Sequence, residues 1–176
     1  MKVYYLTPSI DYELSSMGLK KILEKVSIMF FEKYKNRGDI PIIFNHCDIL
    51  NKNGIEAIPI VIDNRFGMNL DWFYHDTAAQ RMGRDFIYNI CDDDVLICPS
   101  TMCSAISLFS KGKKFLFVQN YSKYSIGSAE VYNYDGIITL KGYCEDYIKQ
   151  YTKVPVYSVL NGIDLKIYKG EFAALM

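Results

Sequence analysis

Short apolar runs recur along the whole chain and indicate the fold. They occupy residues 2–6, 55–62, 94–98, 114–118, 136–140 and 154–160, and turn residues bound each of them. Several of these runs are apolar throughout rather than alternating, which is typical of strands in a parallel sheet that is covered on both faces. Each run is therefore predicted to form one strand of a mostly parallel sheet.

The longest segment between the apolar runs has the spacing of an amphipathic helix. Over residues 16–37, apolar side chains recur at the i, i+3, i+4 and i+7 positions, and Ser15 or Ser16 can cap the first turn. The same segment carries several lysines. Packing against the sheet or a partner chain is the ordinary role of such an apolar face, and peripheral contact with a membrane is the alternative.

A second helix is expected to begin at Asp39, which can cap its first turn. Pro41 is tolerated in a first turn, and Gly54 can end the helix. A strand over residues 40–44 is the competing interpretation. Shorter helices are predicted at residues 101–110 and 143–151.

Strands and helices that alternate along a chain predict the α/β fold class. Right-handed crossovers would then build a three-layer sandwich with a mostly parallel, Rossmann-like sheet. The chain has 176 residues, of which 50% are hydrophobic. This length suits one well-buried core and is too short for two ordinary domains, so a single domain is expected.

Charge and cysteine content narrow the class of protein. The chain has 20 basic and 20 acidic residues, so no nucleic-acid partner is expected. Its five cysteines form no CxxC pair, and their odd number argues against a disulfide framework. Reduced thiols, no signal-peptide pattern and no run of roughly 20 apolar residues predict a cytoplasmic protein, at most peripheral at a membrane.

No metal site is expected from the sequence. The two histidines, His46 and His75, have no paired spacing with cysteines, as a zinc site would require. The acidic triplet at residues 92–94 precedes an apolar run, whereas site residues of a parallel sheet follow the strands. We interpret the triplet as a solvated turn before the strand.

Polar clusters follow the apolar runs. In an open parallel sheet the carboxyl ends of the strands meet at one edge, where ligands bind and helix amino termini point. These clusters are therefore expected to line one site for a small polar ligand. They are residues 7–9, 63–65, 99–101, 119–121, 141–143 and 161–164.

Four stretches of the sequence, in this order, resemble landmarks of family-four glycosyltransferases, which have the two-lobed GT-B fold. They are FNHCDILNKNGIEAIPIV (44–61), DDVLICPS (93–100), KKFLFVQNY (113–121) and PVYSVLNGID (155–164). In that family these landmarks belong to the amino-terminal lobe, which binds the acceptor, while the other lobe binds a nucleotide-sugar donor. The resemblance implies transfer of a sugar to a carbohydrate or lipid-linked acceptor.

The resemblance also implies which residues bind the acceptor. Gly38 and Asp39 match the glycine-bearing loop before the first helix, although the family usually has a second glycine where Asp39 stands. Gln119 matches the polar end of the acceptor-side strand, and its amide can both donate to and accept from sugar hydroxyls. The other implied residues are Ser100, Thr101, Asn120 and Tyr121 on the acceptor side, and Asn161, Gly162 and Asp164 facing the second lobe.

His75 is the candidate for the catalytic base. Related enzymes often place a histidine or an acidic residue where this sequence has Ser100 and Thr101, and neither hydroxyl is a competent base without help. His75 precedes Asp76, and this is the only His–acid neighbour pair in the chain. The alternative is a surface or loop histidine.

As a relative of this family, the chain would divide at residue 164. Residues 1–164 would form the acceptor-binding domain, with a helical insertion near 12–37, and residues 165–176 would be a truncated interdomain linker. The carboxyl-terminal donor-binding domain would be missing, so this domain would bind no cofactor and would be inactive alone. The alternative is a free-standing Rossmann-like binding or interaction module without catalysis.

Overall fold

The computed structural model describes most of the predicted core. The described residues are 1–7, 39–61, 73–119, 129–140, 142–159, 166–168 and 171–173. The helix predicted at residues 16–37 lies outside them. So do six predicted site residues, which are Gly38, Asn120, Tyr121, Asn161, Gly162 and Asp164.

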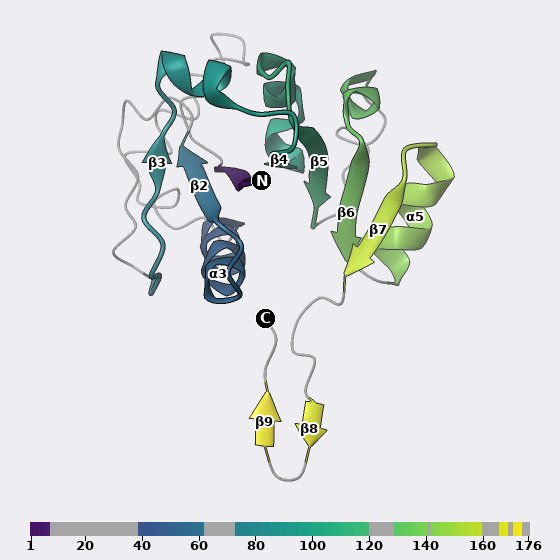
Figure 1. The fold of residues 1–176 in the computed structure, drawn as a ribbon. Coiled ribbons are helices and arrows are strands. Elements are labelled where there is room, and N and C mark those ends of the chain that lie inside the picture. Colours follow the sequence, from purple (N-terminus) through teal and green to yellow (C-terminus); the bar gives the residue numbers. More distant parts are fainter. Residues whose placement is uncertain are drawn as a thin grey trace, which may run out of the picture.

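Seven parallel strands form one sheet, in the order β3-β2-β1-β4-β5-β6-β7 (Figure 1). All six predicted strands belong to this sheet, which confirms a single α/β domain with a Rossmann-like arrangement. The strands are β1 (Val3–Thr7), β2 (Ala57–Val61), β3 (Gln80–Arg81), β4 (Val95–Pro99), β5 (Lys113–Val118), β6 (Gly136–Leu140) and β7 (Val156–Val159). A separate antiparallel pair consists of β8 (Lys166–Tyr168) and β9 (Glu171–Ala173).

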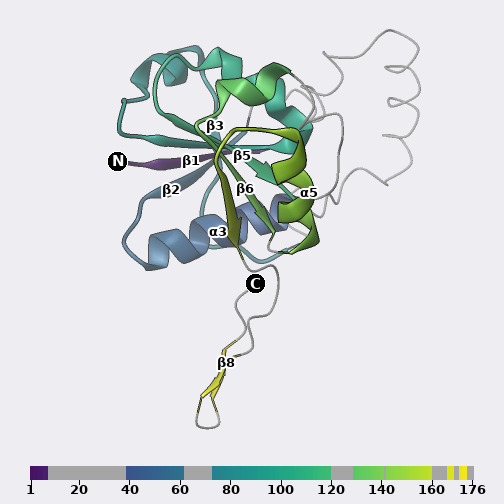
Figure 2. The same cartoon turned by 90° about the vertical axis from the view of Figure 1, so that its right-hand side faces the viewer.

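Helices cover both faces of the sheet. Figure 2 shows α3 on one side and the teal and green helical turns of η1 to η3 on the other. The structure confirms a helix rather than a strand after Asp39, and it gives α5 the predicted bounds. The helices are α3 (Asp39–Lys52), η1 (Arg84–Asn89), η2 (Ser100–Leu108), η3 (Ala129–Asn133) and α5 (Tyr143–Tyr151). Among the described residues, no helix is long and apolar enough to cross a membrane.

Alternate residues of β1 contribute to two separate cores. Val3 and Tyr5 pack with Ile43 and Cys47 on the α3 side of the sheet. Tyr4 and Leu6 belong to the larger core under η1, η2, η3 and α5. Because successive side chains of a strand point to opposite faces, Thr7 continues the α3-side series. Thr7 therefore ends β1 on the α3 side of the sheet.

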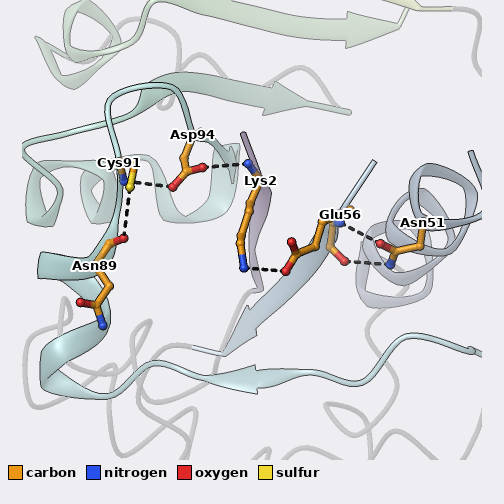
Figure 3. Close-up of polar contacts among 7 residues, drawn as sticks. Lys2, Asn51, Glu56, Asn89, Cys91 and Asp94 are labelled. Carbon is orange, nitrogen blue, oxygen red and sulfur yellow. Dashed lines mark hydrogen bonds and ion pairs between the residues drawn. The ribbon is translucent and has the colours of Figure 1, made fainter. Parts of the chain in front are cut away.

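Asn53 and Gly54 form the turn from α3 into β2. Gly54 has φ +79°, a left-handed conformation that favours glycine at a helix end. Asn51 then holds the start of β2, because its side chain accepts from the N–H of Ala57 at 2.8 Å and donates to its carbonyl at 2.9 Å (Figure 3). The side-chain amide of Asn51 therefore forms hydrogen bonds with both backbone groups of Ala57, as a residue of a neighbouring strand would.

Asp94 connects three segments at the amino-terminal edge of the sheet. Its carboxylate accepts from the N–H of Lys2 at 2.7 Å and from the N–H of Cys91 at 2.9 Å (Figure 3). The prediction that the triplet precedes its strand is confirmed, since β4 begins at Val95. The prediction that it is solvated is wrong for Asp94, which is only 4% exposed because both oxygens are used inside the fold.

Candidate functional site at the switch point

The strand order places a topological switch point between β1 and β4. From β1 the chain proceeds to β2 and β3 on one side, and from β4 it proceeds to β5, β6 and β7 on the other. In such sheets the crevice for a ligand lies outside the carboxyl ends of the two strands at this point. The described residues that end β1, β4 and β5 there are Thr7, Pro99 to Thr101, and Gln119.

The ladder between β1 and β4 stops before either strand ends. Its last pair is Tyr5 with Ile97, and each strand then continues for two residues, to Thr7 and to Pro99. The neighbouring ladders do not stop there, because β1 pairs with β2 up to Thr7 and β4 pairs with β5 up to Pro99. Pro99 also has no N–H with which to extend a ladder. The two strands therefore part at the switch point.

Thr7 places a buried hydroxyl at the parted strand ends. The residue is 0% exposed, and its Oγ1 atom has no hydrogen-bond partner among the residues that the structure describes. A buried hydroxyl without a partner costs free energy, and most buried polar groups in proteins avoid this state. Thr7 is thus an unsatisfied polar group at the place where this fold binds ligands.

His46 lies on the same side of the sheet, on α3. Its half-buried ring packs between two aromatic rings, with ring centroids 5.7 Å from Tyr5 on β1 and 5.5 Å from Phe117 on β5. No described residue is hydrogen-bonded to this ring. Burial lowers the pKa of His46, which favours a neutral imidazole that can accept a proton or a hydrogen bond.

Three polar residues that the sequence predicted as acceptor-binding lie at this edge. Ser100 is half-buried and Thr101 is exposed in the first turn of η2, where no side chain caps the helix. Gln119 follows β5 and is half-buried. Asp39, at the start of α3, follows the segment that leaves β1. We define the switch-point site as Thr7, His46, Ser100, Thr101 and Gln119.

His75 is not part of the switch-point site and packs against Phe44 of α3. Its ring packs on Phe44 at 4.8 Å and on Phe73 at 5.0 Å, and its Nδ1 atom is 3.1 Å from the carbonyl oxygen of Thr77. These contacts are with α3 and with residues 73–77, and none of them is with Ser100, Thr101 or Gln119. This environment suits a packed loop histidine, and a catalytic role stays a prediction.

An open groove beside α3 is a second polar feature. It is lined by Asp48, Asn51, Lys52, Asp76 and Thr77. Its main polar groups are already paired: Asp48 accepts from the N–H groups of Asp76 at 3.0 Å and of Thr77 at 2.8 Å, and Lys52 lies 3.0 Å from Asp76. These interactions attach the segment before β3 to α3, so we assign the groove a structural role.

The cysteines show no reactive arrangement. None of the five forms a disulfide bond, and burial raises the pKa of Cys47 and of Cys98 to about 12, which disfavours the nucleophilic thiolate. Within the described part of the chain, no group of three or more His, Cys, Asp or Glu residues could hold a metal ion.

The fold and the switch-point site define the class of this protein: a doubly wound α/β domain with polar groups at the carboxyl edge of its parallel sheet. Comparisons with models of protein families, with curated proteins and with solved structures gave no match.

Sequence reasoning missed His46 as a binding residue, and it included Thr7 only as part of the polar cluster at residues 7–9. His46 is three residues after Ile43 and four before Leu50, so helical spacing alone places it on the face of α3 that packs on the sheet. Thr7 is the polar last residue of an otherwise apolar strand. That its hydroxyl has no partner depends on where the β1–β4 ladder stops, which the sequence does not reveal.

The burial of His46 predicts a low titration midpoint. Its folded pKa lies below the value of about 6.5 in an unfolded chain, so folded protein binds the proton less readily. The lowered pKa of His46 therefore has no effect on folding stability well above pH 6.5. As the pH falls below about 6.5, the unfolded chain binds the proton more readily than the folded protein, and the free energy of unfolding decreases. A two-dimensional NMR titration should show a midpoint below about 6.5 for this ring. A midpoint at or above that value would contradict the packing between Tyr5 and Phe117.

Proposed function

We propose that this domain binds a neutral, hydroxyl-rich ligand at the switch-point site, as the acceptor-side lobe of a nucleotide-sugar-dependent glycosyltransferase of GT-B type. The observation that carries the proposal is the parting of β1 and β4 beside polar, uncharged side chains. The four stretches that resemble family-four glycosyltransferases support it, because they fall on α3 to β2, on β4, on β5 and on β7, in the expected order.

The chemistry of the site favours a sugar or polyol over a phosphate. Hydroxyls of threonine and serine and the amide of Gln119 can both donate and accept, as sugar hydroxyls do. Among Thr7, Pro99 to Thr101 and Gln119 there is no lysine or arginine, the residues that usually pair with phosphate. A neutral imidazole at His46 fits a neutral ligand as well.

In this proposal the nucleotide-sugar donor is bound by a second domain. The present domain would hold the acceptor, so the 176-residue chain is expected to bind acceptor-like polyols without transferring sugar. A binding module without catalysis is the second candidate. It is favoured by one observation, that Ser100 and Thr101 follow β4 where related enzymes often carry a histidine or an acidic residue.

Ligand-observed NMR on the full chain tests the proposal. The probes are methyl α-D-glucopyranoside, myo-inositol, inorganic phosphate and uridine diphosphate. We expect saturation transfer to one or both polyols, and weaker or no transfer to the two anions. Binding of uridine diphosphate in preference to the polyols would contradict the assignment, because it would make this the donor-binding domain.

A further inference from the structure

Apart from tyrosines and cysteines, four polar side chains are buried in the described part of the chain, and three of them have partners. Asp94 and Asp48 accept backbone N–H groups, and Thr139 donates to the carbonyl of Val118 at 3.0 Å. Thr7 is the exception. Because hydrogen bonding of buried polar groups is the rule, the exception needs a cause at its own position.

The position of Thr7 supplies that cause. Thr139 is equally buried, but it lies within β6 on the opposite face of the sheet, where the next strand offers a carbonyl. Thr7 ends β1 two residues beyond the last pair with β4, so no such carbonyl reaches its hydroxyl from that side. A residue that only filled space could be valine, which has the same shape without the unsatisfied group.

We infer that the hydroxyl of Thr7 is a direct binding group for a hydroxyl of the polyol ligand, at the parted ends of β1 and β4. This inference rests on the proposed function and names a residue and a partner group within it. Thr7 can donate to or accept from the ligand hydroxyl, and His46 on the same face can accept from a second one. The hydroxyl of Thr7 is closed to water without ligand, so binding requires a local opening at the end of β1.

The substitution Thr7→Val tests the inference because stability and affinity should change in opposite senses. Without ligand, removal of an unsatisfied hydroxyl should raise the melting temperature by roughly 2–6 °C. The affinity for the polyol that binds the wild type should fall roughly 3- to 10-fold, because one hydrogen bond is lost. Differential scanning calorimetry and NMR titration measure the two effects on the full chain.

Thr139→Val is the matched control, since it removes an equally buried hydroxyl that does have a partner. It should lower the melting temperature and leave the polyol affinity unchanged. If Thr7→Val lowers the melting temperature, or binds the polyol as the wild type does, the inference is overturned while the proposed function stands. If the wild type binds no polyol, the proposed function fails, and this inference with it.

Discussion

Replacing Asp94 with alanine is expected to lower the free energy of unfolding by about 2–4 kcal/mol, because the buried carboxylate makes two charge-assisted hydrogen bonds to backbone N–H groups that would lose their acceptor. These groups belong to Lys2 before β1 and to Cys91 before β4, at 2.7 and 2.9 Å from the carboxylate. The loss should therefore loosen the amino-terminal ends of both central strands. Urea unfolding followed by circular dichroism measures the change.

Asp92→Ala is the control for this prediction. Asp92 belongs to the same acidic triplet but is exposed, so its replacement should change the free energy of unfolding by less than about 0.5 kcal/mol. Equal effects of the two substitutions would show that net charge, and not the two hydrogen bonds of Asp94, governs stability at this edge.

Replacing Phe44 with alanine should cost about 3–5 kcal/mol, the usual range for a fully buried phenylalanine. Phe44 is 0% exposed on α3, and its ring packs on Phe73 at 5.4 Å and on His75 at 4.8 Å. The substitution leaves a cavity between the helix and the segment that leads to β3. Chemical denaturation gives the magnitude, and proteolysis between residues 73 and 79 reports whether that segment detaches.

Tyr88→Ala serves as the comparison for Phe44→Ala. Tyr88 is 83% exposed in η1, so the removal of its ring should have little effect on unfolding. A loss from Phe44→Ala no larger than that from Tyr88→Ala would contradict the packing of residues 73–77 against α3.

The sheet was largely predictable because its strands carry their signal locally. Six continuous apolar runs became β1, β2 and β4 to β7, and most of these strands are largely buried, whereas the edge strand β7 is mostly exposed. The strand β3 could not be predicted, since it consists of Gln80 and Arg81, both exposed. Its pairing with Ile60 and Val61 depends on anchoring by α3, which is a tertiary effect.

The candidate site was predictable in location but not in composition. The parallel topology requires the residues after each strand to share an edge, so Ser100, Thr101 and Gln119 were expected together. The roles of Thr7 and Asp94 depend on which partners the fold brings to a buried oxygen. Sequence patterns do not contain this information, which is why Asp94 was interpreted as solvated and Thr7 was not singled out.

The most direct test of the account is a backbone amide NMR map of the full chain during titration with the polyol that binds. We predict shifts at the amides of Thr7, Ser100, Thr101 and Gln119 and in the ring of His46, with none at Asp94 on the opposite edge. Shifts confined to the groove at Asp48 and Thr77, or to the amino-terminal edge, would contradict a binding site at the switch point.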